Sequence, residues 1–156
     1  MKNIISEKAG EYREFYRNHL FENVIPFWMG SDLLDREYGG YITSVDREGR
    51  GYNSDKSVWF QGRGLWTFSA LCNNYGAAEE WLWAARLGKT FLEKYCVDSD
   101  GRLFFQVTRD GKPLRKRRYM FSESFYVIGM AEYSVAANDP DALRKAEECF
   151  ELMLKI

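Results

Sequence analysis

The spacing of apolar residues near the start of the chain predicts an amphipathic helix. From Glu7 to about Phe27, rings and aliphatic side chains recur at steps of three and four. The residues in this pattern are Tyr12, Phe15, Tyr16, His19, Leu20 and Val24. Pro26 is expected to end the helix, because proline interrupts a helix interior.

Beyond this helix, the pattern predicts a β-hairpin and then two helices. Alternating apolar residues over 38–45 are typical of a strand, and the polar, glycine-bearing segment 46–50 predicts a turn into a returning strand. A helix is predicted from about Ser57 to Tyr75, and another, rich in Ala, Leu and Trp, from about Ala77 to Tyr95.

The same order of elements then begins again. Residues 98–101 predict a turn, Leu103 to Thr108 a strand and 109–111 a hairpin tip. A helix is predicted from Tyr119 to Ala137. Asn138-Asp139-Pro140 predicts the start of a last helix, because proline suits a first turn.

An internal repeat explains this recurrence. A shift of 62 residues places Phe121 on Trp59, Glu123 on Gln61 and Phe125 on Arg63 without a gap. The same shift superposes Gly101 on Gly39 and residues 109–111 on 47–49. Such self-similarity predicts stacked supersecondary units. We therefore expect a mainly α protein of helix-hairpin-helix repeats with short β-hairpins, at about 38–95 and 100–156, within a single incomplete domain, 1–156.

The final residues suggest that the stack continues. Residues 152–156 form an apolar run with no glycine, asparagine or proline to close the helix. We interpret the chain as truncated, which would leave an open apolar edge. One hypothesis without catalysis follows, in which this edge makes the chain an interaction module.

Composition and charge restrict the classes of partner that the chain is expected to bind. A net charge of -1 and a hydrophobic content of 46% fit a globular protein that binds neither nucleic acid nor a membrane surface. The basic run 115–118 is interpreted as a solvated hairpin strand. Without a signal peptide or an apolar span, the chain is predicted to be cytoplasmic. The three cysteines, Cys72, Cys96 and Cys149, lack metal-ligand spacing and are expected to be reduced core residues.

Arg63 is the candidate for chemistry that the sequence favours. It lies in the first two turns of its predicted helix, where a guanidinium adds to the positive end of the helix and suits a developing oxyanion. Gly62 and Gly64 flank it and indicate close backbone approach. Trp59 and Trp66 share its helix face, whereas Gln61 lies on another. The structural alternative is an Arg63 paired with Glu123.

The remaining polar candidates are weaker. Glu123 could be a general base, a hydroxyl-binding carboxylate or the partner of Arg63, and the last is favoured, because the surrounding rings disfavour an unpaired charge. His19, the one histidine, has no partner in motif spacing and is interpreted as a packed or surface residue. Turn propensity explains the acids Asp46, Glu48 and Asp110. No metal-binding or phosphate-loop motif is present.

Four ordered motifs resemble the N-acylglucosamine 2-epimerases, also known as renin-binding proteins. They are Asp35-Arg36-Glu37-Tyr38-Gly39-Gly40-Tyr41, Lys56-Ser57-Val58-Trp59-Phe60-Gln61-Gly62-Arg63, Thr108-Arg109-Asp110-Gly111-Lys112-Pro113 and Phe121-Ser122-Glu123-Ser124-Phe125-Tyr126. The resemblance spans nearly the whole chain and extends to the cellobiose 2-epimerases and aldose-ketose isomerases. It implies the N-terminal part of an (α/α)6 toroid.

The resemblance also implies an activity. These enzymes interconvert N-acetylglucosamine and N-acetylmannosamine by removing and returning the C2 proton, without a redox cofactor and, in some members, with ATP as an effector. The family's oxyanion-holding arginine corresponds to Arg63, and we expect Trp59, Gln61, Phe121 and Glu123 to line the sugar pocket. Two histidines from later helices would move the proton. Neither is present, so the chain alone is expected to be inactive.

Alternatives within and outside this family stay open. The substrate of the same chemistry could be cellobiose or an aldose-ketose pair. A glycoside hydrolase on the same toroid would use paired carboxylates, with Glu123 as one of them. The small-molecule partner is in each case a sugar, and a homodimer is compatible with all of them.

Overall fold

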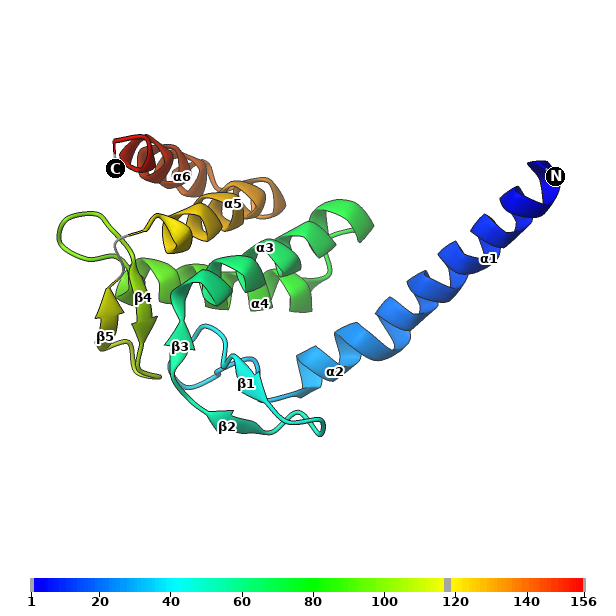
Figure 1. The fold of residues 1–156 in the computed structure, drawn as a ribbon, viewed down its shortest axis with the longest axis horizontal. Helices are drawn as coiled ribbons and strands as arrows, with labels where there is room; N and C mark the ends of the chain where they lie inside the picture. Colours follow the sequence, from blue (N-terminus) through cyan, green and yellow to red (C-terminus); the bar gives the residue numbers. More distant parts are fainter. Residues whose placement is uncertain (1, 117–118, 156) are drawn as a thin grey trace.

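A computed structural model describes residues 2–116 and 119–155, with side chains from residue 8 onward. Its elements are mainly helical, with short antiparallel strands at one end of the helices (Figure 1). Arg117 and Arg118, half of the basic run predicted to be a solvated strand, lie outside the described residues. Arg115 and Lys116 belong to an exposed strand, as expected.

The N-terminal helix is longer than predicted. Helix α1 (Lys2–His19), the π-helix η1 (Leu20–Val24) and helix α2 (Ile25–Gly30) follow one another without a break. The expected end at Pro26 is wrong. Pro26 lies in the first turn of α2, where its missing N–H costs no hydrogen bond, and the wider π-helical turn precedes it. The helix ends at Gly30, before the extended residue Ser31.

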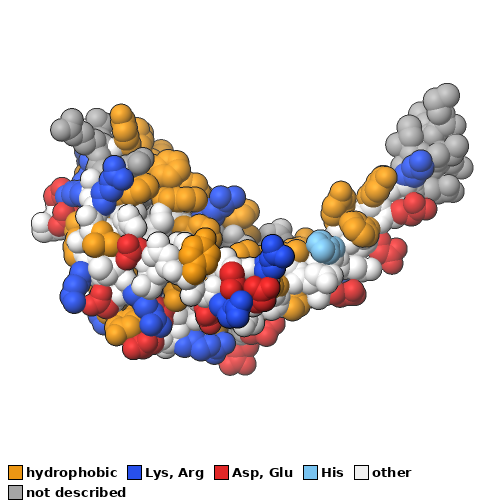
Figure 2. Space-filling model, turned by 60° about the horizontal axis from the view of Figure 1, so that its bottom comes forward, with side chains coloured by type: hydrophobic (Ala, Val, Ile, Leu, Met, Phe, Trp, Pro, Cys, Tyr) orange, Lys and Arg blue, Asp and Glu red, His pale blue; other side chains and the backbone are white. Residues whose placement is uncertain are grey.

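The N-terminal helix extends away from the other helices (Figure 1). Its apolar face is largely exposed, with Tyr12 and Phe15 each 61% accessible. His19 is exposed on the same helix, its ring stacked on Phe15, which confirms the surface interpretation. Figure 2 shows this pale blue side chain beside hydrophobic ones on the protruding arm. Within the described chain, this apolar surface has no covering element.

The two predicted hairpins are present. Strands β1 (Ser44–Val45) and β2 (Gly51–Asn53) form the first hairpin, and β4 (Phe104–Val107) and β5 (Pro113–Lys116) form the second. Strand β3 (Lys56–Ser57), which leads into the next helix, pairs with β4. The segment before that helix therefore completes the sheet of the second hairpin and ties the two units together.

Helices α3 (Val58–Tyr75), α4 (Glu79–Phe91), α5 (Phe121–Ala136) and α6 (Pro140–Met153) match the predicted ones closely, and the π-helix η2 (Leu92–Cys96) extends α4. Helices α3 and α5 lie side by side, with α4 packed on α3 and α6 on α5 (Figure 1). The Asp139 carboxylate caps α6 by accepting hydrogen bonds from the Asp141 and Ala142 N–H groups, and Pro140 occupies its first turn.

The repeat seen in the sequence is also a repeat of backbone geometry. Gly49 N–H donates to the Asp46 carbonyl at 3.0 Å, and 62 residues later Gly111 N–H donates to the Thr108 carbonyl at 3.0 Å. Both glycines adopt positive φ, 83° and 89°, which glycine alone adopts without strain. The 62-residue correspondence therefore reflects two copies of one fold unit.

The core lies between the two helix layers and beneath the hairpins. It contains Leu65 and Phe68 of α3, Phe91 of α4 and Met130 of α5, all buried. Cys72, Cys96 and Cys149 are buried free thiols, as predicted. Burial raises the pKa of the Cys149 thiol to about 12, so this cysteine is a protonated, apolar core residue.

Candidate active site

An aromatic wall forms where α3 and α5 begin. The Trp59 ring centroid lies 5.7 Å from that of Phe121 and 5.5 Å from that of Phe125. Phe121 is 44% exposed and Trp59 is half-buried. The rings therefore present surface to solvent instead of filling a closed core. Trp59, Phe121 and Phe125, here called the aromatic wall, offer flat apolar faces of the kind that stack on sugars.

Arg63 lies one helical turn beyond Trp59. Its side chain is exposed and, among the described residues, forms no ion pair or hydrogen bond. It borders a small apolar cavity of about 200 Å³ between α2 and α3, lined also by Trp28 and Leu33. An arginine without a carboxylate partner keeps all five N–H donors available to an anion or a ligand oxygen.

The glycines on either side of Arg63 permit close packing, as the sequence indicated. A Cβ atom added at Gly62 would lie 2.5 Å from the Phe125 carbonyl oxygen on α5. One added at Gly64 would lie 2.5 Å from the ring of Tyr41. The two glycines therefore bring α3 against α5 on one side and against the first hairpin unit on the other, which fixes the position of Arg63.

Gln61 is fully buried and faces the backbone of Tyr41. Its Oε1 accepts a hydrogen bond from Tyr41 N–H at 2.6 Å, and its Nε2 donates to the Tyr41 carbonyl at 2.8 Å. Both polar groups of the amide are satisfied by the backbone N–H and C=O of one residue. We call this contact the first latch, because it ties α3 to the strand segment that precedes it.

Glu123 makes the corresponding contact in the second unit. Its Oε1 accepts from Leu103 N–H at 3.1 Å and from Arg102 Nε at 2.8 Å. The expected pair between Arg63 and Glu123 is therefore wrong, since the arginine that neutralises Glu123 is Arg102. We call this contact the second latch. Its Oε2 is buried and has no hydrogen-bond partner in the described structure.

The four side chains predicted to bind a sugar thus fall into two pairs. Trp59 and Phe121 lie together on an exposed face next to Arg63. Gln61 and Glu123 are buried and hydrogen-bonded to backbone. The sequence contained one signal for the partner of Glu123. The 62-residue shift places Arg102 on Gly40, so the unit that has Glu123 in place of Gln61 also has an arginine in place of Gly40.

A buried ionic cluster escaped the sequence analysis. Lys56 Nζ donates to Asp35 Oδ2 at 2.8 Å and to the carbonyls of Gly39 and Arg109 at 2.6 and 3.0 Å. Arg109 binds both Asp35 oxygens, each at 2.9 Å. Asp35 and Lys56 are fully buried. The cluster joins β3 to both hairpin units just before α3 begins.

Electrostatics keep this cluster charged. Burial alone would raise the pKa of Asp35, but the hydrogen bonds from Arg109 and Lys56 outweigh it and lower the pKa to about 2. Burial lowers the pKa of Lys56, and Asp35 opposes that shift. All three ammonium hydrogens of Lys56 have acceptors, so its role is structural. We call this group the ionic clamp.

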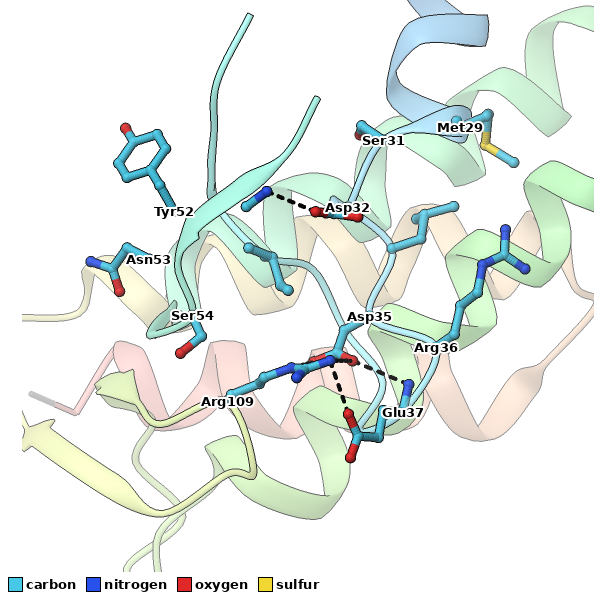
Figure 3. A pocket seen from close by; sticks show the side chains of 14 residues that line it. Met29, Ser31, Asp32, Asp35, Arg36, Glu37, Tyr52, Asn53, Ser54 and Arg109 are labelled. Atoms are coloured by element: carbon cyan, nitrogen blue, oxygen red, sulfur yellow. Dashed lines mark hydrogen bonds and ion pairs between the residues drawn. The ribbon is translucent and has the colours of Figure 1, made fainter. Parts of the chain in front are cut away.

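Two members of the ionic clamp, Asp35 and Arg109, line an open groove. Figure 3 shows Asp35 and Arg109 beneath an open depression of about 680 Å³, with Arg36, Asn53 and Tyr52 at its sides. Asp46 at the first hairpin tip serves the turn, as predicted, because its carboxylate accepts hydrogen bonds from Glu48 N–H and Arg50 N–H. Among the described residues, no group of three or more His, Cys, Asp or Glu side chains could hold a metal ion.

Comparisons with solved structures place this fold in a class. Two solved relatives are cellobiose 2-epimerases, which are α/α toroids. The one from Spirochaeta thermophila has a TM-score of 0.87 and 29% identity, covering 96% of this chain and 37% of that one. A D-mannose isomerase, 17% identical with a TM-score of 0.79, shares the fold over 91% of this chain and 35% of that one. The predicted toroid fold is confirmed.

Sequence relatives identify the family. The profile of the N-acylglucosamine 2-epimerase (GlcNAc 2-epimerase) family matches residues 40–156. The N-acylglucosamine 2-epimerase of Mus musculus is 37% identical over 157 residues, which is 96% of this chain. A cellobiose 2-epimerase of Dictyoglomus turgidum is 31% identical over 88% of this chain and 35% of its own length. The chain belongs to the N-acylglucosamine 2-epimerase family.

The match covers part of these relatives. The chain spans 36% of the length of the mouse protein, and the matched region is its N-terminal part. In the described residues, no helix is both long and apolar enough to cross a membrane.

Proposed function

We propose that this chain forms the N-terminal part of a sugar 2-epimerase that interconverts N-acetylglucosamine and N-acetylmannosamine. Arg63 carries the proposal, because it is an exposed cation without a carboxylate partner beside the aromatic wall. The greater identity to the mouse N-acylglucosamine enzyme, 37%, than to the Dictyoglomus cellobiose enzyme, 31%, favours the N-acylated substrate.

The proposed reaction needs a cation at this position. Removal of the C2 proton of the open-chain sugar places negative charge on the neighbouring oxygen. Arg63 would donate hydrogen bonds to that oxygen, near the positive end of the α3 helix dipole. The aromatic wall would stack on the apolar face of the sugar and exclude water. Proton transfer requires no redox cofactor, and ATP would act as an effector.

The chain by itself would supply the cation that stabilises the oxyanion, but not the base and the acid. A base and an acid with pKa values near neutrality must remove and return the proton. The single histidine, His19, is exposed on the protruding α1. We therefore expect this chain to bind an N-acetyl sugar weakly and to exchange its C2 proton slowly or not at all.

The alternative of a glycoside hydrolase has less support. That reaction uses a pair of carboxylates on either side of the scissile bond. Glu123, the acid considered for it, is buried and bound to Arg102 and to the Leu103 backbone. Cellobiose remains the alternative substrate, since cellobiose 2-epimerases are among the structural relatives.

Saturation-transfer NMR on the 156-residue chain tests the proposal. N-acetylmannosamine and N-acetylglucosamine should receive saturation, and Arg63→Ala should weaken binding about tenfold, as expected for losing a charge-assisted hydrogen bond. Arg47→Ala, which removes another exposed arginine, at the first hairpin tip, is the matched control and should bind like the wild type.

The outcomes separate the possibilities. Tighter binding of cellobiose than of either N-acetyl sugar would favour the cellobiose alternative. Absence of saturation transfer to all three sugars, or unchanged binding by Arg63→Ala, would overturn the proposed role. Loss of the C2 proton signal in deuterated water, at equal rates for wild type and Arg63→Ala, would remove Arg63 from the mechanism.

A further inference from the structure

Two grooves occupy the same place in the two repeat units. The first lies between the turn at Gly39 and the outer helix α4, and the second lies between the turn at Gly101 and the outer helix α6. Shared positions line both, since Trp83 and Arg86 in the first correspond to Lys145 and Glu148 in the second. The fold therefore creates this groove twice, and the side chains decide its chemistry.

The second groove neutralises its own charges. Lys145 Nζ pairs with Glu93 at 2.8 Å and with Asp141 at 2.7 Å. Glu148 pairs with Arg144 on the same helix. Its lining contains acids and a base that satisfy one another or their neighbours, which leaves no surplus of one sign for a ligand.

The first groove has a surplus of positive charge. Arg86 and Lys94 line it, and no carboxylate does. In the described part of the chain, neither forms an ion pair, and Lys94 Nζ lies 4.9 Å from the Tyr95 ring centroid. The acids near the Tyr38 rim have cations of their own, since Glu37 pairs with Arg109 and Asp110 with Lys112.

Aromatic rings form the rest of the first groove. Tyr38, Trp83 and Tyr95 line it together with Phe91. Arg36 lies over the Trp83 ring at 4.9 Å and borders a neighbouring groove that also contains Glu79 and Glu80. Because Lys145 replaces Trp83 in the second unit, the fold does not require a ring at this position. Trp83 and Tyr95 are partly buried against the core and also line the groove, where they lie beside the two cations that form no ion pair.

We propose that the first groove binds a small phosphorylated ring compound, either a sugar phosphate or a nucleoside monophosphate. Arg86 and Lys94 contact the phosphoryl group through charge-assisted hydrogen bonds. Trp83 and Tyr95 contact the flat or apolar face of the ring. A cavity of about 280 Å³ restricts the ligand to a small molecule of this kind. This site is on the outer helix layer and is independent of the proposed epimerase site.

Calorimetric titration of the 156-residue chain with glucose 6-phosphate, adenosine monophosphate, glucose and inorganic phosphate tests this site. At least one ring phosphate should bind more tightly than inorganic phosphate, and glucose should not bind measurably here. Whether glucose 6-phosphate or adenosine monophosphate binds more tightly identifies the ligand as a sugar phosphate or a nucleotide. Arg86→Glu, which gives the first groove the residue that the second has, should weaken binding at least about tenfold.

Matched variants keep the test specific. Lys94→Ala should also weaken binding, whereas Arg47→Ala, an exposed cation outside the groove, should not. Trp83→Leu should reduce the affinity to that of inorganic phosphate. Failure of both ring phosphates to bind, equal affinity for inorganic phosphate, or unchanged affinity in Arg86→Glu would each overturn the proposal.

Discussion

The two latches make the same connection with opposite electrostatics. In the first, the neutral Gln61 amide binds both the backbone N–H and the backbone carbonyl of Tyr41, and residue 40 is glycine. In the second, the Glu123 carboxylate binds Leu103 N–H, and Arg102 stands where Gly40 stood. The buried carboxylate of Glu123 therefore has an arginine beside it, whereas the neutral amide of Gln61 needs none. The difference between the units is a paired exchange that preserves the fold.

A second paired exchange concerns ring placement. In the first unit, the large Tyr41 ring packs against Gly64 and donates its hydroxyl to the Ala84 carbonyl at 2.8 Å. In the second unit, the strand residue is Leu103 and the helix residue is Tyr126, both buried. The aromatic ring has moved from the strand to the helix, so the volume between them stays filled.

Breaking the ionic clamp should have the largest effect on stability, because its Asp35 and Lys56 are fully buried. The clamp distinguishes the first unit from the second, in which Val97 occupies the position equivalent to Asp35. Asp35→Asn would leave Lys56 buried without its carboxylate, and the free energy of unfolding should fall by about 3–5 kcal/mol. Urea denaturation measures this. Glu37→Gln, which removes an exposed acid from the same Arg109, should change stability by less than about 0.5 kcal/mol.

The second latch should be the next most sensitive. Arg102→Ala removes the cation from a buried carboxylate and should cost about 3 kcal/mol of unfolding free energy. Adding Glu123→Gln should recover part of this loss, because it recreates the neutral amide of the first latch. A double-mutant cycle by thermal denaturation measures the coupling. Additive losses would show that Arg102 does not act through Glu123.

The ionic clamp also predicts acid sensitivity. The pKa of Asp35 is about 2 in the folded chain, below its ordinary value of 3.8. Its contribution to stability is therefore complete above pH 4 and is lost as the pH falls from about 4 to 2, amounting to about 2 kcal/mol. The difference in unfolding free energy between wild type and Asp35→Asn should narrow by about 2 kcal/mol over this range. A constant difference down to pH 2 would contradict the assignment.

Close packing beside Arg63 gives a smaller expected effect. Gly64→Ala places a Cβ atom against the Tyr41 ring, and the cost of overpacking exceeds the gain in helix propensity, for a net loss of about 1 kcal/mol. Combining it with Tyr41→Leu, the residue type at the equivalent strand position, should remove the clash. Gly10→Ala, with no atom near the added carbon, is the control for helix propensity.

The sequence predicted the helices and hairpins of both units, because apolar spacing and the 62-residue shift are local signals. It also indicated close approach at Gly62 and Gly64. The roles of Gln61 and Glu123 could not be predicted from either residue alone, since their backbone partners, Tyr41 and Leu103, lie 20 residues earlier in isolated β-bridges. The ionic clamp joins Asp35, Lys56 and Arg109 from three separate segments. The spacing of residues along the sequence does not predict such long-range contacts.

The end of the first helix shows a different limit. Pro26 was expected to end it, but proline is unfavourable in a helix interior and acceptable in a first turn. The preceding π-helical turn makes Pro26 such a first-turn residue. The spacing of apolar residues does not indicate this change from an α-helix to a π-helix.

Gln61 holds the fold through its backbone contacts, whereas Arg63 is proposed to serve a ligand. Measuring the melting temperature and the N-acetylmannosamine affinity of Arg63→Ala and Gln61→Ala in parallel tests this most directly. We predict that Gln61→Ala lowers the melting temperature by several degrees, whereas Arg63→Ala keeps it within about 2 °C and loses about tenfold in affinity. A melting temperature lowered equally by both variants, with sugar affinity intact in Arg63→Ala, would contradict it.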